Sequence, residues 1–229
     1  PPPDPFRIGD GGFRSPIALR WIGVGAAVLV LFVVATIAKS LYVDWLWFDS
    51  VDSADAVSYS SVFQRIVVVK ILLFTGGAAI SAVVIGANIW LARWFAPEGI
   101  EESFIEEVDP QAIRRVVTVA LVAATLFLAV VFGSVAGGAW RTILSWMNGV
   151  SFGVLDPAFD KDISFYLFDL PAFHAIQVWA LLLVVVSGAA AGAVYGLTFS
   201  LQRFELSITR GMRIHLSLLL GLVLLLIAV

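Results

Sequence analysis

Five long apolar runs limit what this sequence can fold into. About 20 residues of α-helix, at 1.5 Å per residue, cross a bilayer core of roughly 30 Å, and each run approaches or exceeds that length. Backbone groups inside lipid must satisfy their own hydrogen bonds, so each run is expected to be helical. The sequence therefore predicts an all-α integral membrane protein with about five transmembrane helices, over residues 17–39, 66–92, 116–139, 174–199 and 214–229.

The composition supports this prediction and argues against several functions. Hydrophobic residues make up 60% of the chain and charged residues 14%, whereas a soluble domain is about 25% charged. The formal net charge is −3 and no dense block of Lys and Arg occurs, so nucleic acid is not an expected partner. The chain has no cysteine, which removes disulfides and thiolate chemistry.

The distribution of Lys and Arg predicts the orientation, because positively charged loops are retained in the cytoplasm. With a cytoplasmic N-terminus, that side receives nine of them: Arg7, Arg14, Arg20, Arg93, Arg114, Arg115, Arg203, Arg210 and Arg213. The opposite side receives five: Lys39, Arg65, Lys70, Arg141 and Lys161. The first run is too long for a cleaved secretory signal, so it is expected to remain as the first span. Together with the charge distribution, this predicts a multi-pass protein of the plasma membrane with its N-terminus in the cytoplasm.

Composition also assigns the remaining segments. Residues 1–16 are rich in Pro and Gly and are predicted to be a flexible cytoplasmic tail. The acidic loop 97–110 is interpreted as a solvated turn, in preference to a docking surface for a basic partner. The fifth run stops at Val229 without a flanking charge, and the chain does not begin with Met. We therefore expect residues 17–229 to be the transmembrane domain of a longer protein.

The segment between the third and fourth runs is the most informative. Trp140, Leu144 and Met147 recur at helical spacing and predict a short interfacial helix, which Asn148 and the glycine after it would end. Asp156 and the proline after it match a helix N-cap followed by proline at the first helical position. Short interfacial helices are thus expected in this outer segment.

Four carboxylates of the same segment raise the alternative of a divalent-cation site: Asp156, Asp160, Asp162 and Asp169. They lack the glycine and the distal glutamate of a calcium loop. Helix capping, together with pairing to Lys161, accounts for them more simply, so no metal or other cofactor is predicted.

Few polar residues interrupt the apolar runs. Asn88 and Gln177 are suited to hydrogen bonds between helices. His174 and His215 lie at span ends on opposite sides of the predicted membrane, which is typical of interface residues rather than of a proton relay. Neither a nucleophile elbow nor a zinc-binding or phosphate-loop motif occurs, so the chain is not predicted to be an enzyme.

Glycines four residues apart predict close helix packing. The third run contains Gly133 and Gly137, and the fourth contains Gly188, Gly192 and Gly196. This spacing places each set on one helix face, where neighbouring backbones can approach. Packing within this chain is favoured over contact with a protein partner.

One stretch resembles a family signature. Residues 156–171 are similar to the pattern DP-x-F-x-x-DISFY-x-F-x-LP of large bacterial membrane proteins grouped as uncharacterised protein family zero-one-eight-two. The site residues that this signature marks are Asp156, Pro157, Phe159, Asp162, Ser164, Phe165, Tyr166, Phe168 and Pro171. Residues 44–48, 59–63 and 88–93 agree as well, whereas 52–57 look inserted and Ser58 stands where glycine is usual.

The resemblance implies about seven N-terminal spans followed by a large extracytoplasmic domain, and it implies no activity. The marked residues are therefore expected to serve partner contact or loop structure. We expect a membrane anchor or scaffold for an extracytoplasmic domain or for other envelope or membrane proteins. The alternative is a transporter or channel subunit, which normally needs polar groups or broken helices near the bilayer midplane.

Overall fold

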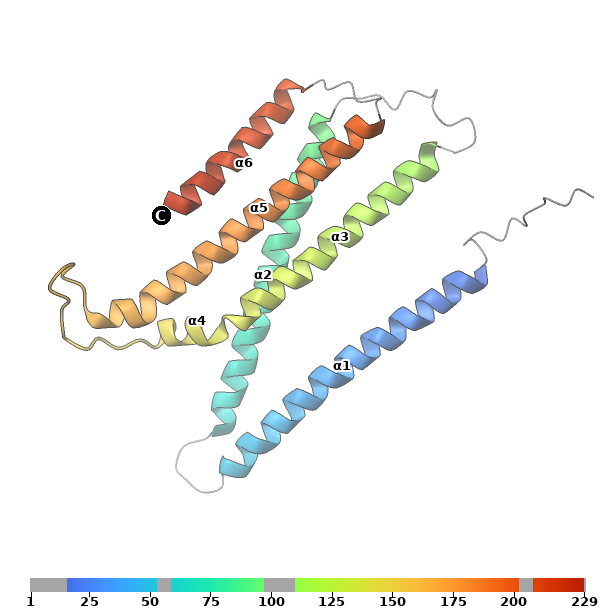
Figure 1. Cartoon of the computed structure of the whole chain (residues 1–229). Coiled ribbons are helices and arrows are strands. Elements are labelled where there is room, and N and C mark those ends of the chain that lie inside the picture. Colours follow the sequence, from blue (N-terminus) through green and yellow to red (C-terminus); the bar gives the residue numbers. More distant parts are fainter. Residues whose placement is uncertain (1–15, 53–58, 97–109, 202–207, 229) are drawn as a thin grey trace, which may run out of the picture. The chain divides into compact units, whose positions relative to one another are not determined.

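The protein is helical in a computed structural model that describes residues 16–52, 59–96, 110–201 and 208–228 (Figure 1). Its elements are α1 (Pro16–Asp52), α2 (Tyr59–Phe95), α3 (Pro110–Gly138), α4 (Trp140–Met147), the π-helical turn η2 (Phe165–Asp169), α5 (Leu170–Leu201) and α6 (Arg210–Ala228). Five helices are long and apolar enough to cross a membrane, and the described residues contain no strand. Residues 1–15 of the predicted tail and most of the acidic loop lie outside the described residues.

The chain divides into two compact units, Pro1–Arg65 and Ile66–Val229. In the first unit, α1 continues well beyond the expected end at Lys39, because residues 40–52 contain no glycine or proline that would end it. The ring of Phe48 lies 5.0 Å from that of Trp47 and 5.5 Å from that of Phe63, near the start of α2. Aromatic contacts therefore order this end of the unit.

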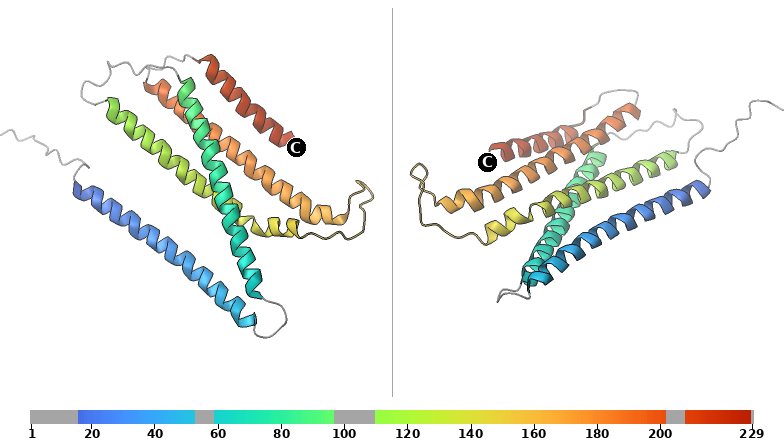
Figure 2. Two further views of the ribbon diagram at one scale, coloured as in Figure 1. Left: turned by 180° about the vertical axis from the view of Figure 1, so that it is seen from behind. Right: turned by 60° about the horizontal axis from the view of Figure 1, so that its bottom comes forward.

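The second unit is a helical bundle. Figures 1 and 2 show α5 running alongside α6, with α3 on its other side and α2 crossing these helices obliquely. Its core contains side chains from four helices: Ile85, Ile89, Ala92, Phe132, Leu183, Ala191, Val194, Tyr195 and Met212. Most other apolar side chains of these helices are exposed, as expected for surfaces that face lipid.

Small residues bring α2 and α3 into close contact. A Cβ atom on Gly133 would lie 2.7 Å from the carbonyl oxygen of Phe74 and 2.9 Å from Cβ of Ala78. A Cβ atom on Gly77 would lie 2.6 Å from Cβ of Ala136. No side chain fits at these distances, so glycine is required on both helices.

The other glycines of the two sets differ in their surroundings. A Cβ atom on Gly137 would still meet the backbone of α2 at 3.4 Å. On α5, a Cβ atom on Gly188 would meet only the side-chain tip of Leu219, at 3.8 Å, and one on Gly192 or Gly196 would meet no atom within 4 Å. The close helix approach that the glycine spacing predicts thus occurs at the glycines of α3. It does not occur at the three glycines of α5, of which only Gly188 faces a side chain of another helix, that of Leu219.

Candidate functional site

The first candidate site begins with α4, which ends at Met147. The backbone N–H of Asn148 donates to the carbonyl oxygen of Leu144, so Asn148 is the helix stop that the sequence predicts. The Nζ atom of Lys70 lies 4.9 Å from the ring centroid of Trp140, at the start of α4. This cation–π contact joins α4 to α2.

A hairpin-like turn follows α4. The N–H of Asp156 donates to the carbonyl oxygen of Lys161 at 2.7 Å, and the N–H of Ile163 donates to that of Val154 at 3.0 Å. Asp160 has a left-handed backbone with φ of 54°. The prediction that Asp156 and Pro157 start a helix is therefore wrong, because the chain turns at 157–160 and becomes helical only at Ile163.

Asp162 holds this turn together. Its carboxylate accepts hydrogen bonds from the hydroxyl of Ser151 at 2.5 Å and from the backbone N–H groups of Gly153 at 2.9 Å and Phe152 at 3.2 Å. It also accepts from the N–H of Ser164 at 2.8 Å, and so caps the new helix. The hydrogen bond from Ser151, followed by that from Ser164, holds the pKa of Asp162 well below its usual range.

The other acids each have separate partners. The hydroxyl of Tyr166 donates to Asp156 at 2.7 Å, and this bond, with a weaker one from a backbone N–H, lowers the pKa of Asp156. The indole N–H of Trp146 donates to Asp169 at 2.9 Å.

Lys161 lies over the ring of Phe165, 5.7 Å from its centroid, and forms no ion pair with the acids in the part of the chain described. Nor do three His, Asp or Glu side chains gather there as a metal site would require.

The aromatic residues of the signature pack the turn onto the next helix. The rings of Phe152 and Phe168 stack at 6.1 Å, and Gly149 leaves room for Phe168, which a Cβ atom would meet at 2.9 Å. The π-helical turn ends at Asp169, two residues before Pro171, whose ring and missing N–H disfavour a regular α-helix over the preceding turn. Phe168 and Pro171 of the signature therefore contribute to the structure of this segment.

The turn also exposes apolar side chains. Phe159, at the tip, is 74% exposed, and Val150 is 65% exposed. Phe152, Val154 and Leu155 are exposed beside them. We call these five residues the apolar rim; Pro157 is exposed with them.

A second candidate site lies inside the bundle. The hydroxyl of Tyr195 on α5 lies 2.8 Å from Nδ1 of His215 on α6, and Nε2 of His215 lies 2.9 Å from Oδ1 of Asn88 on α2. Tyr195 and His215 are only 3% and 4% exposed. The interpretation of His215 as an interface residue is therefore wrong, whereas the predicted interhelical role of Asn88 is confirmed. Gln177 also bonds between helices, donating to the carbonyl oxygen of Leu226 at 2.7 Å.

For a neutral His215, the hydrogen-bond pattern gives the order of donors and acceptors in this polar chain. The amide nitrogen of Asn88 donates to the carbonyl oxygen of Val84, so its Oδ1 accepts from Nε2–H of His215. Nδ1 of the neutral imidazole then accepts from the hydroxyl of Tyr195. Close by, Thr209 caps α6 and donates to the carbonyl oxygen of Phe95 at 3.0 Å, which ties the start of α6 to the end of α2. Sequence patterns did not connect Asn88 with His215 and Tyr195, because the three are single polar residues in separate runs.

This architecture defines an all-α integral membrane protein with an ordered turn between two of its five candidate spans. The sequence profile of the uncharacterised protein family UPF0182 matches residues 21–229, and the chain belongs to that family. It is 34% identical over 228 residues to a UPF0182 protein of Streptomyces coelicolor, covering 96% of this chain and 22% of that one.

Other relatives also belong to the UPF0182 family. A UPF0182 protein of Cupriavidus necator is 35% identical, over 86% of this chain and 22% of its own length. One of a Nocardioides species is 37% identical, over 85% of this chain and 19% of its own length. The chain thus spans about a fifth of the length of the curated relatives it matches. No solved structure matches it.

Proposed function

We propose that this region is the non-catalytic membrane anchor and scaffold of a bacterial cell-envelope protein in the plasma membrane. Its N-terminus is cytoplasmic, and the turn between α4 and α5 faces outward, where it contacts an extracytoplasmic domain or a partner membrane protein. The observation that carries the proposal is an apolar rim on a turn that Asp156 and Asp162 hold in place.

The turn is both exposed and ordered, and the two properties together favour binding. Contiguous exposed apolar surface favours contact with protein or membrane. A turn fixed by hydrogen bonds has already lost much of its conformational freedom, so binding to it costs less entropy. The few polar groups inside the spans agree with an anchoring role.

Site-specific photocrosslinking in native membranes tests the contact. A benzoylphenylalanine at Phe159 of the full-length protein is expected to give a discrete adduct with a partner protein or with another part of the same chain. The same probe at Phe127, an exposed residue of the apolar α3 span, serves as the control and should react with lipid alone. If the probes at both positions react with lipid alone, the proposal that the turn contacts protein is rejected.

Cysteine labelling tests the orientation, since the chain has no cysteine of its own. Phe159→Cys should react with a membrane-impermeant maleimide in intact cells. Arg7→Cys should react only after permeabilisation. The reverse pattern would overturn the proposed topology.

Transport is the second candidate, and the chain of Asn88, His215 and Tyr195 favours it. Ionisable groups buried among transmembrane helices often serve proton or solute pathways. Proteoliposomes with an internal pH dye should then show proton entry under an imposed potential, and His215→Leu should abolish it. If the unmodified protein admits no protons, this candidate is dropped.

A further inference from the structure

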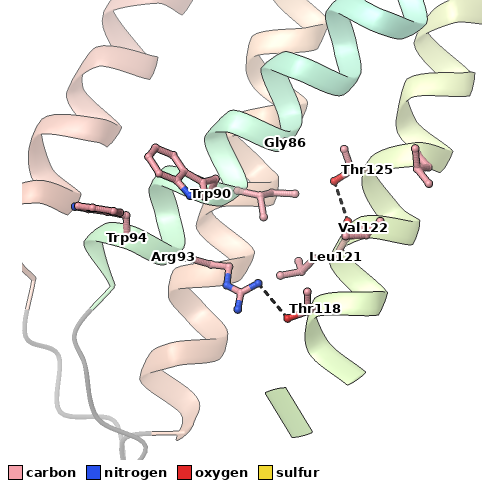
Figure 3. Close-up of a pocket in the computed structure, with 10 residues that line it drawn as sticks. Gly86, Trp90, Arg93, Trp94, Thr118, Leu121, Val122 and Thr125 are labelled. Carbon is pink, nitrogen blue, oxygen red and sulfur yellow. Dashed lines mark hydrogen bonds between the residues drawn. The ribbon is translucent and has the colours of Figure 1, made fainter. Parts of the chain in front are cut away.

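A groove opens between α2 and α3, apart from both sites described above (Figure 3). Its volume is about 490 Å³, and its walls come from Gly86 to Trp94 on α2 and from Thr118 to Leu126 on α3. Trp94 is 70% exposed and its ring lies 5.4 Å from that of Trp90. The groove therefore opens on the surface of the bundle and is not an internal cavity.

One end of the groove is cationic. The guanidinium of Arg93 points across it and donates to the hydroxyl of Thr118 at 3.2 Å (Figure 3). That hydroxyl in turn donates to the carbonyl oxygen of Arg114, one turn earlier on the same face of α3. Because α2 ends at Phe95 and α3 begins at Pro110, both arginines lie near helix ends.

The other end of the groove, at Gly86, is apolar. The space above Gly86 is bounded by the methyl group of Thr125, which an added Cβ would meet at 3.9 Å. Val122 and Leu126 form the opposite wall. From Arg93 to Gly86 the groove follows α2 for about 10 Å, at 1.5 Å per residue.

We propose that this groove binds one anionic glycerophospholipid from the surrounding bilayer. Its phosphate lies at Arg93, the cation that lines the groove, with Arg114 one helical turn from Thr118 as a second nearby cation, and an acyl chain lies along Gly86 and Val122. Arginine offers a planar set of donors that suits phosphate oxygens, and tryptophan side chains favour headgroup depth. A groove that is charged at its helix-end mouth and apolar within matches the two parts of such a lipid. The inference does not depend on the proposed anchoring function.

Native mass spectrometry of the full-length protein tests the site. The protein is delipidated in non-ionic detergent and titrated with dioleoyl phosphatidylglycerol or dioleoyl phosphatidylcholine. One phosphatidylglycerol should bind about tenfold more tightly than phosphatidylcholine. Arg93→Gln combined with Arg114→Gln should weaken phosphatidylglycerol binding by about tenfold, as expected for lost charge-assisted hydrogen bonds. Arg213→Gln, an exposed arginine of α6 outside the groove, is the matched control and should change nothing.

A second pair of variants tests the apolar end. Val122→Trp fills the groove and should weaken binding of both lipids. Val119→Trp is its control, because Val119 lies on the same helix, is 66% exposed and does not line the groove. Should Val122→Trp fail to fold, as judged by its melting temperature, Leu126→Trp replaces it.

Four outcomes would overturn the proposal. They are equal binding of the two lipids, equal loss in Arg213→Gln, displacement of the lipid by an equal concentration of inorganic phosphate, and occupation of the groove by α1. The last is detected as a disulfide, in native membranes, between Val122→Cys and one of a series of cysteines introduced along α1.

Discussion

Nε2 of His215 lies 2.9 Å from Oδ1 of Asn88, although 127 residues separate them in the chain. This bond joins α6 to α2, and the bond from Tyr195 extends the connection to α5. In the described part of the chain, no buried side-chain polar atom lacks a hydrogen-bond partner. Inside an apolar bundle this complete satisfaction matters, since an unpaired buried donor costs about 1–3 kcal/mol.

The first prediction concerns this polar chain. Asn88→Leu should destabilise the bundle by about 1 kcal/mol, because Nε2–H of His215 loses its acceptor. Reversible unfolding in mixed micelles measures the loss. The double variant Asn88→Leu with His215→Leu should lose less stability than the sum of the losses in the two single variants. Strictly additive losses would show that the two residues are not coupled.

The second prediction concerns Asp162. Asp162→Ala removes the acceptor for Ser151, Gly153 and Ser164, so amides of residues 151–164 should exchange hydrogen roughly fivefold faster, the size typical of a lost N-cap. Mass-resolved hydrogen exchange measures the change. Asp160→Asn is the control, because asparagine also tolerates the left-handed backbone there. Unchanged exchange in Asp162→Ala would rule out its organising role.

The third prediction is a pH dependence of the same turn. The folded pKa values of Asp156 and Asp162 are depressed, so their contribution to stability is fully present above the ordinary aspartate pKa of about 3.9. It is lost as the pH falls through the folded pKa values. Exchange of residues 151–164, corrected for intrinsic rates, should be constant from pH 7 to about 5 and rise below about pH 4. A turn that loosens between pH 7 and 5 would contradict this assignment.

The fourth prediction compares two glycines. Gly133→Ala should destabilise the contact of α2 and α3 by about 1–3 kcal/mol, because its Cβ would lie 2.7 Å from a carbonyl oxygen. Gly192→Ala should be neutral or stabilise by up to about 1 kcal/mol, since its Cβ meets nothing and alanine favours helix. Thermal unfolding of both variants measures which of them is less stable; Gly133→Ala is expected to be. Equal changes in stability would contradict the difference in packing between Gly133 and Gly192.

Several features were predictable from local patterns. The apolar runs predicted the five long helices because a helix in lipid depends on composition over its own length. Asn148 was predictable as the end of α4 for the same local reason. The signature of residues 156–171 identified the family, yet it misled on the helix start, because an Asp-Pro pair is compatible with both a helix N-cap and a turn. The hydrogen bond from Tyr166 and the left-handed Asp160 decided for the turn.

The sequence by itself determined the class, the helices and the family, since these follow from composition and from one contiguous motif. The tertiary structure alone decided which glycines matter and which polar residues meet. Gly133 and Gly192 have the same spacing pattern, but only Gly133 faces the backbone of another helix. His215 has the local sequence features of a membrane-interface residue. Its partners, Asn88 on α2 and Tyr195 on α5, become apparent only in the tertiary structure. Contacts between residues on different helices depend on how the helices cross, and no local pattern encodes that geometry.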